Sequence, residues 1–364
     1  MERTFLYHIN LTRECNLRCS HCYIHTEVKK RTTRLSGADL EKMAHGIVQH
    51  MENTSYTVAD IFILGGEPSI MGLEYFETHI PKFREILSKG KFKTKLNIVS
   101  NLLHDDIVPM CRLFDNVNTS WEPVSRFKPK IEARWRDKVQ ELREDGHIVY
   151  LTSAITKPLV QMGGAQAANY LYEELGFKKI HFGFFIPSGD GLTYADAMLP
   201  AFNKTSQFLI ELCDWYVERR EIDSELCINP VESMIASLAA GQPLDDIVCP
   251  MTSGSMDIDY DGNAMACIEG GGRVAPDWSG NVLKTSVLDV TKSKHYRESC
   301  NKVKRINPKC MGCEYFQVCR SGCSVVSAHS DLQQSDECHG FKRFIQHVEN
   351  LTIKGLKPKY GVSD

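Results

Sequence analysis

The chain has 364 residues, 42% of them hydrophobic and 24% charged, which is typical of a folded globular protein with room for a large and a smaller domain. The formal net charge of -3, without a long run of Lys or Arg, disfavours nucleic acid as a partner. No segment approaches the ~20 apolar residues of a membrane span and the first residues lack a signal peptide, so we expect a cytoplasmic protein without a membrane partner.

Residues 5–221 alternate apolar, β-rich runs with amphipathic helical patterns, which predicts repeated strand–helix units around a mostly parallel sheet. Six strands are expected: Phe5–Asn10, Asp60–Leu64, Lys95–Ser100, Asn116–Ser120, Ile148–Ile155 and Lys179–Ile186. The first helix is expected to begin near Ser36, because Ser36 and Asp39 form a capping-box pair ahead of the helical spacing of Leu40, Met43 and Ile47.

The pattern changes after a long helical stretch over residues 200–222. A region rich in glycine and cysteine begins near Cys249, and within it Asp261 and Gly262 form a turn signal that predicts a small hairpin. We therefore predict an α/β domain over residues 1–225, a small Cys-rich domain over 226–350 with this hairpin and a C-terminal helix, and a loose polar tail over 351–364.

Three cysteines follow the first predicted strand with the spacing Cys-x3-Cys-x2-Cys: Cys15, Cys19 and Cys22. In a cytoplasmic chain, clustered cysteines indicate metal or redox chemistry rather than disulfides. Three thiolates can bind three irons of a 4Fe-4S cube and leave one iron open to a ligand that is not protein. Three basic residues nearby are expected to favour the thiolate forms: Arg13, Arg18 and Lys29.

Two other interpretations of this cluster stay open at this stage. One is a zinc site completed by His21 or His25, although structural zinc prefers two separated cysteine pairs. The other is a fully ligated iron-sulfur cluster with Cys111 or Cys213 as a distant fourth ligand.

The triad, followed by the aromatic residue Tyr23, resembles the signature of the radical S-adenosylmethionine (SAM) superfamily. The resemblance implies a catalytic cluster whose open iron chelates the amino and carboxylate groups of SAM. One-electron reduction then cleaves a carbon–sulfur bond, and the resulting 5'-deoxyadenosyl radical removes a hydrogen from the substrate. It further implies a partial (β/α)6 TIM-like barrel with its reactive groups at the C-terminal strand ends.

The second predicted strand ends in the run Gly65, Gly66, Glu67 and Pro68, which is similar to the family's Gly-Gly-Glu-Pro motif. Glycines permit a close approach of the backbone, and the resemblance implies that Glu67 accepts a hydrogen bond from the SAM ammonium.

Two later segments match SAM-binding motifs less well. Ser100 and Asn101 stand where relatives often carry Thr-Asn-Gly, and Ser120 and Glu122 lie in the place of their Ser-x-Asp-Gly segment. The resemblance implies that Ser120 and Glu122 bind ribose hydroxyls and that Arg134 neutralises the SAM carboxylate. For each of these side chains a solvated loop or helix face is the alternative.

The C-terminal third contains seven more cysteines in one pattern: Cys249, Cys267, Cys310, Cys313, Cys319, Cys323 and Cys338. From spacing alone, four of them can hold zinc: Cys310, Cys313, Cys319 and Cys323. The complete pattern resembles the SPASM extension of radical SAM proteins, which binds two auxiliary 4Fe-4S clusters.

The resemblance distributes these cysteines over two clusters and so implies three 4Fe-4S clusters in the chain. One auxiliary cluster would use Cys310, Cys313, Cys319 and Cys338. The other would use Cys249, Cys267 and Cys323. It lacks a fourth ligand, and the resemblance implies either another cysteine or a position left open for substrate. As a cysteine we favour Cys227 over Cys300, although a lone cysteine is usually an inert buried side chain.

The SPASM resemblance also implies a peptide or protein substrate, in which such enzymes install crosslinks, thioethers or oxidised side chains during ribosomal peptide maturation. Anaerobic sulfatase maturases place an Asp directly after the equivalent of Cys267, where this chain has Ile268 and then Glu269, so we do not expect sulfatase maturation. Glu269 or Asp257 is either a base for another reaction or a solvated carboxylate.

Because the first strand begins near residue 5, we expect no N-terminal peptide-recognition domain, and a leader peptide would need another surface or a separate leader-binding protein. An electron donor such as flavodoxin or ferredoxin is expected as a further partner. Two alternative functions stay open: oxidation or epimerisation of a small molecule such as an aminosugar, and a non-catalytic metal-binding module.

Overall fold

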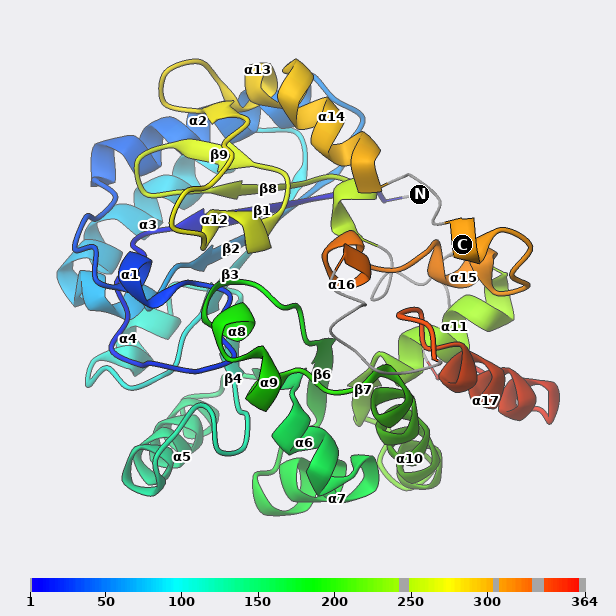
Figure 1. The fold of residues 1–364 in the computed structure, drawn as a ribbon. Coiled ribbons are helices and arrows are strands. Elements are labelled where there is room, and N and C mark those ends of the chain that lie inside the picture. The colour runs from blue at the N-terminus through cyan, green and yellow to red at the C-terminus, as the bar shows by residue number, and fades with distance from the viewer. Residues whose placement is uncertain (1, 242–248, 304–307, 329–336, 360–364) are drawn as a thin grey trace.

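Six parallel strands follow one another along the chain and are joined by helices (Figure 1). The computed structural model describes residues 2–241, 249–303, 308–328 and 337–359. The strands are β1 (Thr4–Asn10), β2 (Val58–Leu64), β3 (Lys93–Val99), β4 (Asn116–Ser120), β5 (Val149–Ile155) and β6 (Lys179–Phe184). Each pairs in parallel with the next, which confirms the predicted α/β fold class with a large parallel sheet.

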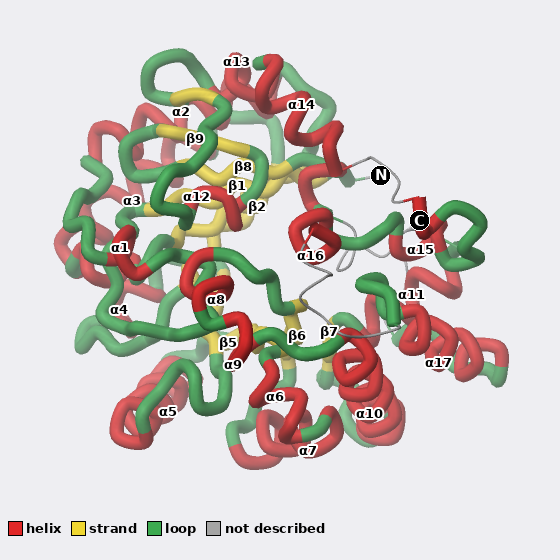
Figure 2. The backbone as a smooth tube through the Cα atoms, in the orientation of Figure 1, coloured by secondary structure: helices red, strands yellow, loops and turns green. Residues whose placement is uncertain are grey.

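Helices cover the outside of the curved sheet, as Figure 2 shows by the outer position of the helices around the strands. The longer ones are α2 (Gly37–Glu52), α3 (Leu73–Leu87), α5 (Pro129–Glu144) and α10 (Phe202–Arg220). The shorter ones are α1 (Thr26–Lys29), η1 (Pro68–Met71), α4 (Ile107–Cys111), α6 (Lys157–Met162), α7 (Gly164–Asn169), η2 (Tyr170–Glu174), α8 (Gly189–Thr193) and α9 (Ala195–Met198). The predicted cap of α2 is confirmed, because Ser36 Oγ accepts a hydrogen bond from Asp39 N at 3.1 Å.

The sheet extends beyond the six predicted strands at both of its ends. β7 (Cys227–Asn229) pairs in parallel with β6, and β8 (Ser255–Ile258) pairs in parallel with β1. β9 (Asn263–Met265) runs antiparallel to β8, which confirms the predicted hairpin at Gly262, and β10 (Gly280–Asn281) completes a ten-stranded sheet. The Cys-rich region is thus continuous with the sheet of the first part, and the domain boundary near residue 225 stays a prediction.

Short helices fill the C-terminal part of the chain. They are α11 (Val231–Ala240), η3 (Pro250–Thr252), α12 (Ile268–Gly271), α13 (Val287–Lys292), α14 (Lys294–Val303), η4 (Pro308–Cys310), α15 (Phe316–Cys319), α16 (Ser324–Ala328) and α17 (Lys342–Ile353). α17 is the predicted C-terminal helix and packs against α10 and α11.

The predicted tail over residues 351–364 is ordered in two places, because α17 continues to Ile353 and residues 357–359 are held by hydrogen bonds. Arg220 Nη2 donates to Lys357 O at 2.8 Å, and Lys359 N donates to Glu232 Oε1 at 2.7 Å. These hydrogen bonds hold the segment on α10 and α11. Residues 360–364 of the predicted tail lie outside the described residues. No helix in the described part of the chain combines the length and apolar character needed to cross a membrane.

Candidate active site

The loop after β1 carries three of the cysteines: Cys15, Cys19 and Cys22. Two backbone hydrogen bonds dock it on the loop after β2. Gly66 N donates to Thr12 O at 2.8 Å, and Glu67 N donates to Glu14 O at 2.8 Å. A Cβ at Gly66 would overlap the carbonyl oxygen of Glu14, so only glycine permits this approach.

The buried carboxylate of Glu67 connects the loops that follow β2 and β3. It accepts hydrogen bonds from Ser69 Oγ at 2.7 Å, Ser100 Oγ at 2.7 Å and Asn101 N at 2.7 Å. Asn101 Nδ2 in turn donates to Asn16 Oδ1 at 2.7 Å, next to the first cysteine. The predicted SAM-binding segments therefore meet at neighbouring strand ends, where Glu67 braces the loops through protein donors, and its contact with the SAM ammonium stays a prediction.

Glu122, predicted to bind ribose, is instead held in a buried ion-pair cluster. It pairs with Arg126, its Oε2 lies 3.2 Å from His21 Nε2, and its Oε1 accepts from Ala154 N at 3.0 Å. Although burial raises the pKa of Glu122, the charges of Arg126 and His21 hold it well below its usual range. These three partners occupy the Glu122 carboxylate. Ser120 is the last residue of β4 and is half-buried at this strand end, as predicted.

Arg134 lies on the outside of the molecule, which corrects its predicted role at the SAM carboxylate. It belongs to α5, its side chain is 50% exposed, and Nη2 lies 2.7 Å from Asp105 Oδ1. The helix position directs the guanidinium to a surface ion pair.

Two of the three basic residues expected to favour thiolates are engaged elsewhere. Arg13 is fully buried and lies 2.9 Å from Asp257 and 2.9 Å from Asp259, both of the hairpin region. Arg18 donates to backbone carbonyl oxygens, including that of Cys15.

Lys29 and Arg126 are the cations that act on the triad. Burial raises the pKa of Cys19, and Arg126 exerts the largest opposing effect. Burial also raises the pKa of Cys22, and there Lys29, which pairs with Asp190 at 2.6 Å, opposes it most. Sequence reasoning missed Arg126, because it stands in an irregular loop without a recognisable motif.

Seven cysteines share one local feature, a backbone N–H two residues further along the chain that donates to the sulfur. They are Cys15, Cys22, Cys249, Cys267, Cys319, Cys323 and Cys338. Leu17 N lies 3.3 Å from the Cys15 sulfur, and Ile24 N lies 3.4 Å from the Cys22 sulfur. Such N–H···S bonds stabilise sulfur ligands that carry negative charge, so these loops fit iron-sulfur clusters.

Burial sets the protonation of these side chains when no metal is bound. It raises the pKa of Cys15 to about 12 and that of Cys19 to about 11, so neither is a free reactive thiolate. Cys111 in α4 and Cys213 in α10 are fully buried core residues, and neither is among the groups that act on the thiols of the triad.

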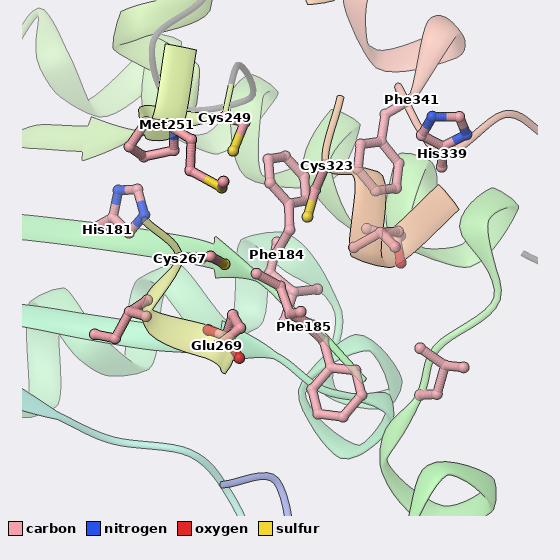
Figure 3. Close-up of a pocket in the computed structure, with 18 of the residues that line it drawn as sticks. His181, Phe184, Phe185, Cys249, Met251, Cys267, Glu269, Cys323, His339 and Phe341 are labelled. Atoms are coloured by element: carbon pink, nitrogen blue, oxygen red, sulfur yellow. The ribbon is translucent and has the colours of Figure 1, made fainter. Parts of the chain in front are cut away.

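Three C-terminal cysteines line one cavity of about 260 Å³: Cys249, Cys267 and Cys323 (Figure 3). The pKa of Cys267 is raised to about 12, first by burial and then by its neighbours Glu269, Cys249 and Cys323. The thiols therefore lie near one another. They come from separate places in the chain, before η3, before α12 and before α16.

The remaining four cysteines also form a group. Burial and then its neighbours Cys338, Cys310 and Cys313 raise the pKa of Cys319 to about 11. Within the described ranges no three His, Cys, Asp or Glu side chains converge tightly enough for a single metal ion.

Residues 249–314 match the SPASM family model, described as an iron-sulfur cluster-binding domain. The chain is 20% identical over 362 residues to a cysteine-type anaerobic sulfatase-maturating enzyme of Clostridium perfringens, covering 92% of this chain and 93% of that enzyme. The structure of anSMEcpe with bound AdoMet (SAM) has a TM-score of 0.75 at 17% identity, over 96% of this chain and 98% of that chain. Streptococcus suis SuiB bound to its precursor peptide SuiA has a TM-score of 0.58 at 15% identity, over 99% of this chain and 75% of SuiB.

The domain match, the full-length relative and the shared fold agree with the cysteine pattern. Residues 249–314 thus match an iron-sulfur cluster-binding SPASM domain, and the whole chain is similar to SAM-binding maturases in sequence and fold. These similarities support SAM and 4Fe-4S clusters as cofactors, and the loops with N–H···S bonds are suited to the clusters.

The cavity adjoins the triad loop through Tyr23 and Glu269. Tyr23 follows Cys22 directly. Burial raises the pKa of Tyr23, Arg13 lowers it, and the nearby Glu269 is one of the groups that raise it further. Glu269 lines the cavity, its Oε2 accepts from Ser188 Oγ at 3.1 Å, and burial raises its pKa to about 7. Figure 3 shows its carboxylate at the edge of the cavity.

The structure places Cys300, rather than Cys227, near Cys249, one of the three cysteines of the cavity. Burial and then the neighbouring Cys323 and Cys300 raise the pKa of Cys249 to about 11, and α14, which carries Cys300, packs on η3. Cys227 lies on β7, where it raises the pKa of Tyr216. A sequence pattern alone does not show this, because both cysteines stand outside recognisable motifs.

Proposed function

We propose that this chain is a radical SAM enzyme that modifies a peptide side chain held in the cavity beside the triad loop. The observation that carries the proposal is the position of the cavity, which extends from the SPASM cysteines to Glu269, next to Tyr23 and the triad. When bound, SAM and the clusters supply a radical that removes one hydrogen atom from the substrate and an oxidant that takes the remaining electron.

The proposal assigns three 4Fe-4S clusters to the cysteine groups. Cys15, Cys19 and Cys22 hold the SAM cluster. Cys249, Cys267, Cys323 and Cys300 hold the auxiliary cluster at the cavity. Cys310, Cys313, Cys319 and Cys338 hold the other auxiliary cluster. The N–H···S bonds and the mutual proximity of the thiols support these sets.

In this proposal the chain's own residues hold SAM at the C-terminal ends of the strands. Gly65 and Gly66 offer backbone groups at close approach, and Glu67 braces their loop against the loop after β3. Ser120 offers a hydroxyl at the end of β4. Arg126 supplies buried positive charge for the SAM carboxylate in place of Arg134.

A peptide substrate fits the cavity better than an aminosugar does. Most of the lining side chains are apolar, and sugar hydroxyls buried against them would lose hydrogen bonds to water without replacement. SuiB, which shares the fold, was solved with a precursor peptide, and this also supports a peptide. Sulfatase maturation stays outside the proposal, because Ile268 directly follows Cys267.

A crosslink, a thioether or an oxidised side chain each forms with net loss of two hydrogens from the peptide. One leaves as an atom and the other as a proton, so the site needs a proton acceptor. Glu269 faces the cavity with Oε2 held by Ser188, which positions the carboxylate for this role.

The proposed function is tested by anaerobic reconstitution with iron, sulfide and a reductant, followed by assay of 5'-deoxyadenosine. We expect about twelve irons per chain and SAM cleavage that increases when a peptide substrate is present. Full iron loading without any SAM cleavage would contradict the proposal, as would tight zinc binding that excludes iron.

Replacing Arg126 with Gln is expected to weaken SAM binding by roughly 10–100-fold, the range typical of groups that support a metal site. The cluster should also become harder to reduce, because a buried positive charge near Cys19 is lost. SAM titration and EPR-monitored redox titration measure the two effects. Arg134→Gln is the matched control and should bind SAM within about twofold of wild type; the reverse order of the two variants would restore Arg134 as the carboxylate ligand.

Cys300→Ala and Cys227→Ala form a second matched pair. We expect Cys300→Ala to lower the iron content and to change the Mössbauer spectrum of one auxiliary cluster, because a 4Fe-4S cube normally has four cysteine ligands. Cys227→Ala should retain the wild-type iron content and spectrum. An unchanged spectrum in Cys300→Ala would show that this cluster has a different fourth ligand.

A further inference from the structure

Resting on the proposed function, we infer that the cavity selects a large apolar side chain of the peptide, and an aromatic one above all. The inference deepens the proposal by naming the residue class that the radical acts on. It excludes Ser and Cys, the small polar residues, as preferred targets.

The walls of the cavity are mostly apolar. The apolar lining residues come from β5, from β6 and the loop after it, from the junction of α9 and α10, and from the SPASM part: Ile155, Phe184, Phe185, Ile186, Leu199, Pro200, Phe202, Pro250, Met251, Ala266, Ile268, Val326 and Phe341. A small polar side chain would leave this apolar surface without contacts, whereas a ring or a branched chain would bury it.

Aromatic side chains form a fixed wall on one side of the cavity. The rings of Phe184 and Phe341 stack with centroids 4.6 Å apart and planes 10° apart, and the ring of Phe202 meets Phe341 edge-on at 6.0 Å. Figure 3 shows Phe184 reaching toward the three cysteines and Phe341 beside His339. A substrate ring can add to this stack in an offset or edge-to-face geometry.

The backbone at Phe341 is consistent with a wall that is built for a ligand. Phe341 has φ +56°, a left-handed conformation that costs a residue with a Cβ roughly 1–3 kcal/mol. The strain places a ring in the cavity three residues after Cys338. Such strain persists where surrounding packing enforces it, and it is concentrated at binding sites.

Size agrees with a ring as the occupant. The cavity of about 260 Å³ includes the space that the proposed cluster would take, and an apolar cavity of only ~150 Å³ already binds benzene. Cys249, Cys267 and Cys323 take one side of it for the proposed cluster, and Figure 3 shows Phe185 and Glu269 on the side away from Cys249. The few polar groups, which include His8 and His181, suit the orientation of one substrate rather than the solvation of several hydroxyls.

The test uses the reconstituted holoenzyme and five acetylated and amidated peptides of the form Gly-Gly-Gly-X-Gly-Gly-Gly, where X is Trp, Phe, Leu, Ser or Cys with a deuterated side chain. Two quantities are measured for each peptide: its affinity by calorimetry, and deuterium transfer into 5'-deoxyadenosine. We expect the Trp and Phe peptides to exceed the Ser and Cys peptides by roughly 10–200-fold in both, the discrimination available to an apolar pocket. Equal or faster transfer from Ser or Cys, or no preference in affinity, would overturn the inference.

The two readouts separate this inference from the proposed function. If SAM is not cleaved but the Trp peptide still binds at least tenfold more tightly than the Ser peptide, the function fails and the cavity assignment stands. Phe184→Leu should reduce the Trp-to-Ser affinity ratio about tenfold, because it removes one ring of the wall. Phe92→Leu, a half-buried phenylalanine just before β3, is the control and should leave that ratio and SAM cleavage unchanged.

Discussion

Replacing Cys19 with Ala is expected to abolish SAM cleavage in the reconstituted protein. Cys19 is the central residue of the triad, and its loss leaves two sulfur ligands for a cluster that needs three to keep its fourth iron available. The decrease in 5'-deoxyadenosine should exceed the roughly 10–100-fold loss typical of outer partners of a metal site. Iron content should fall by about four atoms per chain, since the two auxiliary clusters stay intact.

Cys213→Ala is the matched control for Cys19→Ala. Both cysteines are buried, but Cys213 packs in the core between α10 and its neighbours, away from any group of thiols in the described structure. The control should lose some stability and keep its iron and its SAM cleavage. Deoxyadenosine formation that survives in Cys19→Ala would show that the SAM cluster is held elsewhere.

The sequence predicted the parallel sheet well because its six main strands carry strong local signals. Each is a short β-rich run between helical patterns, and the observed strand ends agree with prediction within two residues. The cap at Ser36 and the turn at Gly262 were predictable for the same reason, since the relevant hydrogen bonds join residues near in sequence. β7 was missed because three residues are too few for a periodic pattern, and the parallel pairing of the hairpin strand β8 with β1 joins segments far apart in sequence.

The SAM-contacting side chains were less predictable, because a motif match assigns a role without showing the competing partners. Glu122 occupies the place of a ribose ligand in the motif, but its carboxylate forms ion pairs with the nearby Arg126 and His21. Arg134 has the right charge on the wrong helix face. In both cases contacts between loops decide the role, and those contacts depend on how the strands are arranged in space.

Arg13 shows the same limit over a longer distance in sequence. Its neighbourhood in the chain suggested an effect on the cysteines, whereas its partners Asp257 and Asp259 lie 244 and 246 residues away. Asn10 Nδ2 also donates to Asp257 Oδ1 at 2.7 Å. These contacts attach the hairpin of the SPASM part to the segment that leads into the triad, so Arg13 couples the two halves of the site.

Replacing Arg13 with Met is accordingly expected to destabilise the protein by about 3–5 kcal/mol, because it leaves two buried carboxylates without a counter-charge. The midpoint of thermal unfolding, followed by circular dichroism on the anaerobic holoprotein, should fall by roughly 5–10 °C. Arg112→Gln removes a guanidinium from a surface ion pair with Asp145 and should lower the unfolding midpoint far less, because solvent screens that pair.

The pH dependence of the Arg13→Met defect identifies its cause. Burial raises the pKa of Asp259 to about 6 even though Arg13 opposes this effect, so removing Arg13 should raise that pKa further. Below the pKa the carboxyl is neutral and needs no counter-charge, and the loss of stability should therefore be smaller at pH 5 than at pH 7.5. An equal loss of stability at pH 5 and pH 7.5 would show that the defect comes from lost packing of the Arg13 side chain, because packing does not depend on the charge of Asp259.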